Sequence, residues 1–225
     1  MGVHYEGVTD PKTLREVFQA EPPPQLGKVD LWPGDPGLMI RRPVQRAPDF
    51  GAGVEREAVV GSFGLVPSWA ADPTINRNTA IARSETVATK PSFRDAWKNA
   101  QHCILPAHAI YQPDWRSGKE TSARIERVDG MPMGLAGLWS TWKSPKGEWV
   151  HSYTILTIKA DSHPLMNKLH KVTDEKRMVV ILPDSAHDAW LSASADKSMA
   201  FLVPYPAEHM REAAGNSENQ VRSAQ

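Results

Sequence analysis

The first residues of this chain and one histidine have the chemistry needed to attack an aldehyde. Met1 precedes Gly2, and initiator methionine is generally removed before glycine, which leaves a free α-amine. An α-amine titrates at about pH 8, so a useful fraction is the unprotonated nucleophile near neutral pH. Imine formation also needs a proton relay, a role that suits the imidazole of His170. The alternatives are that Gly2 has no chemistry and that His170 is structural or solvent-exposed.

A second set of residues is typical of contacts with a single-stranded nucleic acid. The indole of Trp69 offers a flat face on which a base can stack. Basic side chains neutralise phosphates, and a threonine hydroxyl adds a neutral hydrogen bond to the backbone. The residues expected in these roles are Arg83, Lys171, Arg177 and Thr157. Against this, Trp69 would also fit as a partly buried core aromatic, and Arg83 as the partner of Glu85 or another acid in a salt bridge.

Composition limits the class of protein. The chain has 225 residues, of which 26 are Lys or Arg and 26 are Asp or Glu, so no global positive charge indicates nucleic-acid binding. A local basic groove is compatible with that balance. Cys103 is the only cysteine, which excludes an internal disulfide and a cysteine-based zinc site and fits a reducing compartment. We expect it to be a small buried hydrophobe.

Targeting and cofactor signals are missing from the sequence. It has no apolar run of about twenty residues, which a membrane helix needs, and its first residues lack the features of a secretory signal. No phosphate-binding glycine loop or nucleotide fingerprint occurs, and the 8 histidines show no metal-ligand spacing. We therefore expect a cytoplasmic protein with no membrane contact, nucleotide cofactor or metal.

The elements that must position these residues are short strands and a few short helices. Val, Ile, Leu and aromatic residues cluster in runs bounded by Pro, Gly or charged turns, which is typical of strands. These runs are 37–40, 58–66, 103–105, 133–138, 153–158 and 178–182. Helices are expected from Asp10, an N-cap before Pro11, and over 92–100, 162–170 and 184–193.

One domain is expected over 1–205, because no repeat or clear boundary divides it. The segment 41–54 is interrupted by Pro and Gly and is expected to be a loop, and 206–225 a polar C-terminal tail. The predicted fold is α+β, with a curved, mostly antiparallel β-sheet or barrel core and short flanking helices. Trp115 and Trp139 are placed in this core.

Ordered motifs give a more specific result than any one of them alone. They are HYE at 4–6, FGLVPSW at 63–69, ARSET at 82–86, KPSF at 90–93 and CILPA at 103–107, followed by Tyr111 and Trp115. GLW at 137–139, TILT at 154–157 and the stretch 170–182 continue the series. In this order, over 1–205, they resemble the SOS-response-associated peptidase family, the abasic-site processing proteins.

The resemblance implies a mechanism and a partner. In the family, removal of the initiator methionine exposes a cysteine, whose α-amine condenses with the ring-opened aldehyde of an abasic site in single-stranded DNA. The thiolate then closes a thiazolidine ring, which leaves a DNA–protein crosslink. An Asn, a Glu and a His support the amine, the sugar and the proton transfers. The peptidase label needs no more than self-removal of Met1, because no Ser/His/Asp or Cys/His arrangement is readable here. A monomer is expected.

Three positions of the expected active site depart from the family. Gly2 stands in place of the cysteine, so no thiazolidine can form. Ile81 stands in place of the asparagine and has no donor or acceptor, so it fits as a residue that packs a strand. Gln112 stands in place of the glutamate, where it keeps hydrogen-bonding capacity but is no base; it would equally fit as an ordinary polar loop residue. His170 is retained, with a longer spacer before Arg177 than many family members have.

Three functions are compatible with this pattern. The first is recognition of abasic sites in single-stranded DNA without stable crosslinking. The second is an abasic-site lyase that acts through a Schiff base on the Gly2 amine. The third is a binding or regulatory module of mobile-element origin with no DNA role, which the neutral net charge favours. A cloning remnant would explain Gly2 alone, and the sequence leaves open whether the three substitutions are natural or engineered.

Overall fold

Short strands dominate the computed structural model, which describes residues 4–44 and 55–213. In that part of the chain they form one 12-stranded sheet. Its strands are β1 (His4–Gly7), β2 (Asp30–Leu31), β3 (Pro36–Arg41), β4 (Glu57–Phe63), β5 (Ile81–Arg83), β6 (His102–Asp114), β7 (Thr121–Arg127), β8 (Met133–Lys143), β9 (Trp149–Lys159), β10 (Arg177–Val179), β11 (Ile181–Leu182) and β12 (Met210–Glu212), and the α-helices are α1 (Pro11–Glu16), α2 (Arg94–Lys98) and α3 (His187–Ser192).

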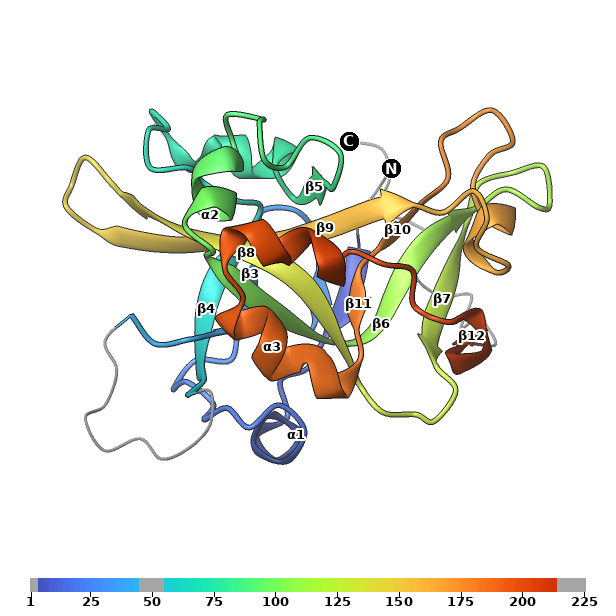
Figure 1. Ribbon diagram of the computed structural model, residues 1–225, viewed down its shortest axis with the longest axis horizontal. Helices are drawn as coiled ribbons and strands as arrows, with labels where there is room; N and C mark the ends of the chain where they lie inside the picture. Colours follow the sequence, from blue (N-terminus) through green and yellow to red (C-terminus); the bar gives the residue numbers. More distant parts are fainter. Residues whose placement is uncertain (1–3, 45–54, 214–225) are drawn as a thin grey trace.

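The sheet closes on itself as a small barrel. Strands β8, β9, β4, β3 and β6 pair in that order, and β6 pairs back with β8. Every pairing in this ring is antiparallel except that of β4 with β9. Helices α1, α2 and α3 flank the barrel (Figure 1). The α+β prediction with a curved, mostly antiparallel core is therefore confirmed.

Aromatic residues fill part of the barrel core. Tyr5 and Tyr153 are fully buried, and their hydroxyl groups lie 2.6 Å apart. Phe63 stacks on Tyr153 at 5.5 Å between ring centroids and meets Tyr5 edge-on at 5.2 Å. Gly37 is required beside them, because a Cβ at that position would lie 2.2 Å from the Tyr153 hydroxyl. Burial of this pair raises the pKa of both tyrosines, so their mutual hydrogen bond stays neutral.

The predicted helices form where a cap or an apolar face supports them. Asp10 accepts a hydrogen bond from the Thr13 amide at 2.8 Å, which begins α1 as expected. Helices α2 and α3 lie within the predicted 92–100 and 184–193. The prediction for 162–170 was wrong in kind, because only the 3₁₀ turn Met166–Lys168 forms there. The His163 ring accepts from the Met166 amide at 3.1 Å and holds the chain in a tight turn.

The strands extend further than the apolar runs. The stretch 178–182 divides into β10 and β11 at Val180, whose backbone bonds to both β8 and β9. Strands β1, β2, β5, β7 and β12 had no long apolar run to mark them. Strand β12 pairs with β7 and lies inside 206–225, so the sheet continues into the segment predicted as a tail. Positions 45–54 of the predicted loop and 214–225 of that tail lie outside the described residues.

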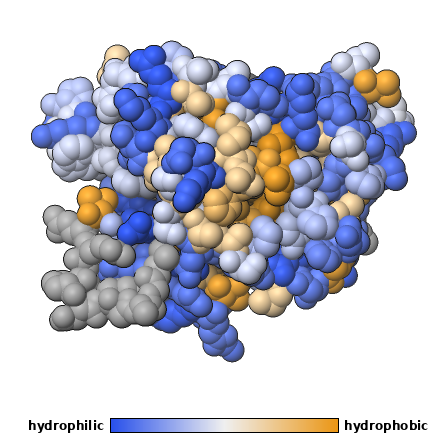
Figure 2. Space-filling model, viewed as in Figure 1, coloured by the Kyte–Doolittle hydropathy of each residue, from blue (hydrophilic) through white to orange (hydrophobic). Residues whose placement is uncertain are grey.

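Two further observations concern the surface of the protein and the length of its helices. Polar residues cover most of the face in Figure 2, and apolar residues gather near its centre. Within the described ranges, no helix has both the length and the apolar character that a membrane crossing requires. The elements that matter for the site are β5, β9 and β10 on one side of the barrel and the hairpin of β8 and β9 on the other (Figure 1).

Candidate functional site

Strand β9 brings together residues that are far apart in the sequence. Strand β5 pairs with it in parallel, with Arg83 opposite Thr157, and β10 pairs with it antiparallel on its other edge. Arg83, Thr157 and Arg177 therefore meet across three neighbouring strands. With Glu85 and Glu175 they form a group that we call the arginine–carboxylate cluster.

Arg177 is the centre of this cluster and is almost completely buried. Its guanidinium donates to Thr157 Oγ1 at 3.1 and 3.2 Å and to the Thr157 carbonyl oxygen at 3.0 Å. It also contacts both Glu85 oxygens at 3.0 and 3.2 Å and Glu175 at 2.9 Å. The same guanidinium lowers the pKa of Glu85. Thr157 is fully buried, so the phosphate contacts predicted for Thr157 and Arg177 do not fit this arrangement, in which the protein itself uses their polar atoms.

Arg83 is the exposed member of the cluster. Its side chain is 55% exposed, and its Nη1 lies 2.8 Å from Glu175 Oε2, so its partner is Glu175 rather than Glu85. An exposed ion pair of this kind contributes about 1 kcal/mol or less, which a phosphate can replace at little cost. Ile81 lies two residues earlier on β5, half-buried against the core, as the packing alternative for that residue predicts.

His170 lies next to the cluster and is buried. Its Nε2 is 2.8 Å from the Arg177 carbonyl oxygen. Because a carbonyl only accepts, Nε2 carries the hydrogen and Nδ1 is left as an acceptor. Nδ1 has no hydrogen-bond partner among the residues that the structure describes. Burial lowers the pKa of the imidazole, so the ring is neutral near pH 7 and suited to take up a proton.

The loop that carries His170 is hydrogen-bonded to the residue that follows β6. The Trp115 amide donates to the Leu169 carbonyl at 3.0 Å, and the Lys171 ammonium lies 5.2 Å from the centre of the Trp115 ring. Lys176 donates to the His170 carbonyl at 2.9 Å. Lys171 is exposed, so it is the second basic side chain here that remains available to an anion.

Gln112 is buried on β6 with one polar atom unsatisfied. Only 3% of the residue is exposed, and its Oε1 has no partner in the part of the chain that the structure describes. A buried amide oxygen without a donor costs about 1–3 kcal/mol, so this position favours an incoming N–H or O–H group. Gln112 is therefore a strand residue and not the polar loop residue of the alternative interpretation. Gly2, the other predicted reactive residue, lies outside the described residues.

Trp69 is exposed, not part of the core. Its indole N–H donates to the Pro91 carbonyl at 3.4 Å. Gly64 fixes the start of this segment, because at its φ of 119° a Cβ would lie 1.8 Å from the Asn76 carbonyl oxygen. No hydrogen bond, ion pair or ring contact among the described residues joins Trp69 or Gln112 to the arginine–carboxylate cluster, whereas Arg83, Thr157, His170 and Arg177 are in one network.

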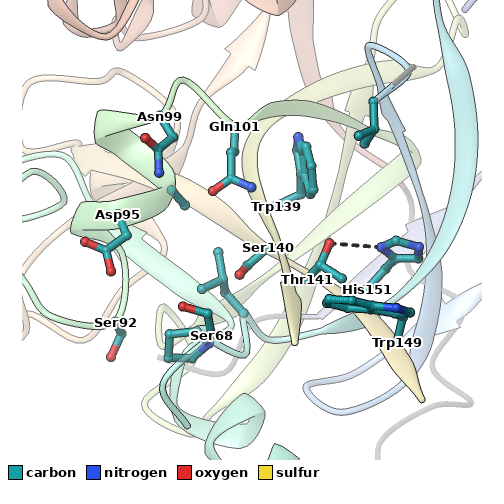
Figure 3. Close-up of a pocket in the computed structure, with 14 residues that line it drawn as sticks. Ser68, Ser92, Asp95, Asn99, Gln101, Trp139, Ser140, Thr141, Trp149 and His151 are labelled. Atoms are coloured by element: carbon teal, nitrogen blue, oxygen red, sulfur yellow. Dashed lines mark hydrogen bonds between the residues drawn. The ribbon is translucent and has the colours of Figure 1, made fainter. Parts of the chain in front are cut away.

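The sequence did not indicate a cavity of about 520 Å³ at the other end of β9, which we call the hairpin pocket. It lies between α2 and the β8–β9 hairpin (Figure 3). Trp139, expected in the core, is half-buried and lines this cavity. The signal for the hairpin was present as Ser144-Pro145-Lys146-Gly147, a turn between two aromatic segments. Lining side chains used below are Ser92, Asn99, Gln101, Trp139, Trp149 and His151.

Cys103 and the metal-ligating residue types are the remaining groups with possible chemistry. Cys103 is buried on β6, and burial raises the pKa of its thiol, which agrees with its predicted role as a small hydrophobe. Among the residues described, no three His, Cys, Asp or Glu side chains gather as a metal site would need.

Known proteins match this chain over most of its length. The family model described as SOS response associated peptidase (SRAP) matches residues 1–218. Abasic site processing protein YoqW of Bacillus subtilis (strain 168) is 33% identical over 154 residues, which cover 66% of this chain and 64% of that protein. Abasic site processing protein HMCES of Gallus gallus is 29% identical over 199 residues, 78% of this chain and 56% of that protein. The match therefore spans less than two thirds of either relative's length.

The fold agrees with solved structures as well. A crystal structure of a protein from Bordetella bronchiseptica is 45% identical, has a TM-score of 0.84 and covers 95% of this chain and 99% of its own. A Bacteroides thetaiotaomicron structure at 22% identity and a TM-score of 0.68 shares the fold. Motifs, barrel and family model together show that this chain belongs to the SOS response associated peptidase (SRAP) family.

Proposed function

We propose that this protein recognises abasic sites in single-stranded DNA and does not lock onto them through a stable crosslink. The relatives that match it are named abasic site processing proteins. The observation that carries the proposal is the position of Arg83. Its exposed guanidinium is held beside a buried, internally neutralised arginine and a neutral histidine, where the motifs at 82–86, 154–157 and 170–182 meet.

Side chains suited to DNA binding are present, whereas a group needed for crosslinking is missing. Arg83 and Lys171 remain available for phosphates, and Trp69 remains available for stacking. The thiol needed beside the α-amine for a thiazolidine is absent, because position 2 is glycine. We therefore expect reversible, salt-sensitive binding, because each phosphate contact releases counterions.

Fluorescence anisotropy tests this proposal. The probe is a labelled single strand with one central tetrahydrofuran abasic analogue, compared with the intact strand and with a duplex. We expect the abasic single strand to bind most tightly, and its affinity to fall as salt rises. Equal affinity for all three, or no dependence on salt, would contradict the proposal. Absence of any binding would favour the regulatory-module alternative.

A second candidate function is an abasic-site lyase, favoured by the Nδ1 of His170, which has no hydrogen-bond partner among the described residues. The Gly2 α-amine attacks C1′ of the ring-opened sugar and water leaves, which gives an imine. His170 then takes the C2′ proton, and the C3′–O bond breaks with the phosphate as leaving group. Hydrolysis of the imine returns the free amine. The neutral state of His170 near pH 7 suits it to the proton abstraction.

Borohydride trapping tests the lyase directly. A natural abasic strand incubated with the protein and borohydride should give a covalent band at neutral pH, and mass spectrometry should show that Met1 has been removed. His170→Gln should reduce strand cleavage while the trapped band persists, because the imine forms on Gly2. An intact Met1 or the absence of a trapped band would exclude this activity.

A further inference from the structure

The hairpin pocket is built from two kinds of surface. Trp139 and Trp149 provide aromatic walls from the β8–β9 hairpin, and Trp149 is 65% exposed. The opposite side carries polar side chains of α2 and the segment that follows it (Figure 3). The Lys143 ammonium lies 5.3 Å from the centre of the Trp149 ring and holds the hairpin indole from outside the pocket lining. The cavity is therefore shaped for a flat molecule of modest size.

Polar groups in this pocket are uncommitted. Ser140 is a mostly buried residue, Gln101 is half-buried, and neither side chain has a hydrogen-bond partner in the described parts of the chain. Asn99 is likewise without a side-chain partner among those residues, and the Asp95 carboxylate meets Arg94 only at 3.7 Å. Because Asn99 and Asp95 are exposed, their polar atoms bond to water, which a ligand with matching groups can replace. Their donors and acceptors are available to a ligand.

The charge of the lining selects the ligand. Of the described residues that line the pocket, none is Lys or Arg, and Asp95 is the only acid. Burial lowers the pKa of His151, and its Nδ1 lies 3.3 Å from the Thr141 hydroxyl, so it is neutral near pH 7. Two cations lie against the indoles, the Arg41 guanidinium 4.1 Å from the centre of the Trp139 ring and the Lys143 ammonium 5.3 Å from that of Trp149, but the lining itself offers a phosphate no cationic side chain. A neutral heterocycle with amino and carbonyl groups fits, because amides and a carboxylate complement such edges and indoles stack on its face.

The pocket is joined to the predicted DNA-binding surface. Pro67 and Ser68 line it and lead directly to Trp69, whose indole N–H bonds to Pro91, the neighbour of the lining residue Ser92. Strand β9 connects the two regions, with His151 at the pocket and Thr157 in the cluster. Six residues of strand span about 20 Å, so the pocket lies a few nucleotides from Arg83.

We propose that the hairpin pocket binds one nucleobase of the strand, a few nucleotides away from the abasic site. This rests on the proposed function, because it needs the strand to continue from Arg83 past Trp69. The base stacks on Trp149 or Trp139, and its edge meets the free groups of Gln101 and Asn99. The strand is thereby held at two points, one for the lesion's phosphates and one for a distant base.

The first test moves a gap along the strand. The probe carries one central tetrahydrofuran, and a second tetrahydrofuran replaces each flanking base in turn. We expect removal of one particular base, not next to the lesion, to weaken binding about tenfold, as the loss of one stacked base does. A uniform effect at all positions, or none, would overturn the proposal.

Variants assign that position to the pocket. Trp149→Ala and Gln101→Leu should weaken binding of the full probe about tenfold and remove the sensitivity to the second gap. Gln25→Leu is the matched amide control, because Gln25 is exposed and outside the pocket, and should change nothing. If Arg83→Ala weakens binding while both pocket variants bind normally, the proposed function stands and this inference fails.

Free deoxynucleosides test whether the pocket binds a base without the rest of the strand. Millimolar deoxynucleoside should quench the tryptophan fluorescence of the wild type and not that of the Trp149→Ala variant. If the protein binds no abasic strand but still binds the nucleoside, the proposed function fails and the pocket takes a free heterocycle instead of a base in a strand. That outcome overturns the proposal.

Discussion

The arginine–carboxylate cluster and the hairpin pocket lie on one strand but differ in what their polar groups are doing. In the cluster, the Arg177 guanidinium is fully used by Thr157, Glu85 and Glu175. In the pocket, Gln101 and Ser140 have no partner among the described residues. The first region is rich in charge, most of it satisfied within the protein, whereas the second is almost uncharged and leaves its hydrogen bonds open.

This difference indicates that the polar groups of the cluster mainly maintain the structure, whereas those of the pocket are open to recognise a ligand. A buried arginine that completes its own hydrogen bonds positions its neighbours, and the exposed Arg83 above it is the side chain left for a ligand. Uncharged open groups in a cavity instead discriminate between shapes and edges. Counting basic residues alone would have assigned both arginines to phosphate binding.

The largest effect should come from introducing a thiol at position 2. Gly2→Cys provides the second nucleophile that traps the imine as a thiazolidine at high effective concentration. We expect a heat-stable band with an abasic single strand on a denaturing gel, where the wild type gives none without borohydride. A Gly2→Ser variant is the matched control, because its hydroxyl is a much weaker nucleophile than a thiolate.

The Gly2→Cys protein can also be used to separate the role of the arginine–carboxylate cluster from that of the hairpin pocket. In Gly2→Cys protein, Arg83→Ala should slow crosslinking on every abasic strand, whereas Trp149→Ala should slow it only on strands long enough to reach the pocket. If both changes slow it equally on a very short strand, the two regions do not have separate roles.

The next largest effect is on stability. Arg177→Ala removes a buried guanidinium, leaves Thr157 Oγ1 and Glu85 without their arginine donor and leaves Glu175 with Arg83 alone, so we expect a loss of about 3 kcal/mol in the free energy of unfolding. Arg83→Ala, which breaks one exposed pair, should cost about 1 kcal/mol or less. Urea unfolding measures both, and equal costs would mean that Arg177 is not the structural member.

How much of this was readable from the sequence differs between the two regions. Arg83 and Arg177 stand in motifs, so their presence in one site could be predicted. Their unequal burial could not, because it depends on β5 and β10 both pairing with β9. The pocket depends on a hairpin whose strands extend beyond the apolar runs, to Lys143 and from Trp149.

Single residues also show which features could and could not be predicted from the sequence. Gln112 fits a polar loop by type, yet β6 continues through it and buries it. Strand β12 has only three residues and lies in a polar segment, so nothing local marks it, and its pairing with β7 is a tertiary contact. The α1 cap at Asp10 was predictable because its hydrogen bond is local.

A smaller effect concerns DNA affinity. Arg83→Ala should weaken binding of the abasic strand about fivefold and reduce the slope of log affinity against log salt by about 0.7, the contribution of one phosphate on a single strand. Anisotropy titrations at several salt concentrations measure this. Gln101→Leu should weaken binding without changing the slope, because an amide meets no phosphate. A changed slope in that variant would place phosphate, not base, in the pocket.

The smallest effect is the part of the pH dependence of stability that the cluster contributes. Arg177 holds the pKa of Glu85 below 4.5, so the folded state favours the carboxylate, and this stabilisation is present above that value and is lost as pH falls through the folded pKa. Buried His102 and His187, each with a pKa of about 4, also make acid destabilising, because the unfolded chain takes up protons first between about pH 6.5 and 4. That contribution is common to wild type and Arg177→Ala.

The stability difference between the two proteins should therefore shrink from pH 6 to pH 3, by less than about 1 kcal/mol because Glu85 is partly exposed. Urea midpoints at each pH measure it, and a difference that stays constant would mean that Thr157, rather than Glu85, is the partner through which Arg177 stabilises the fold.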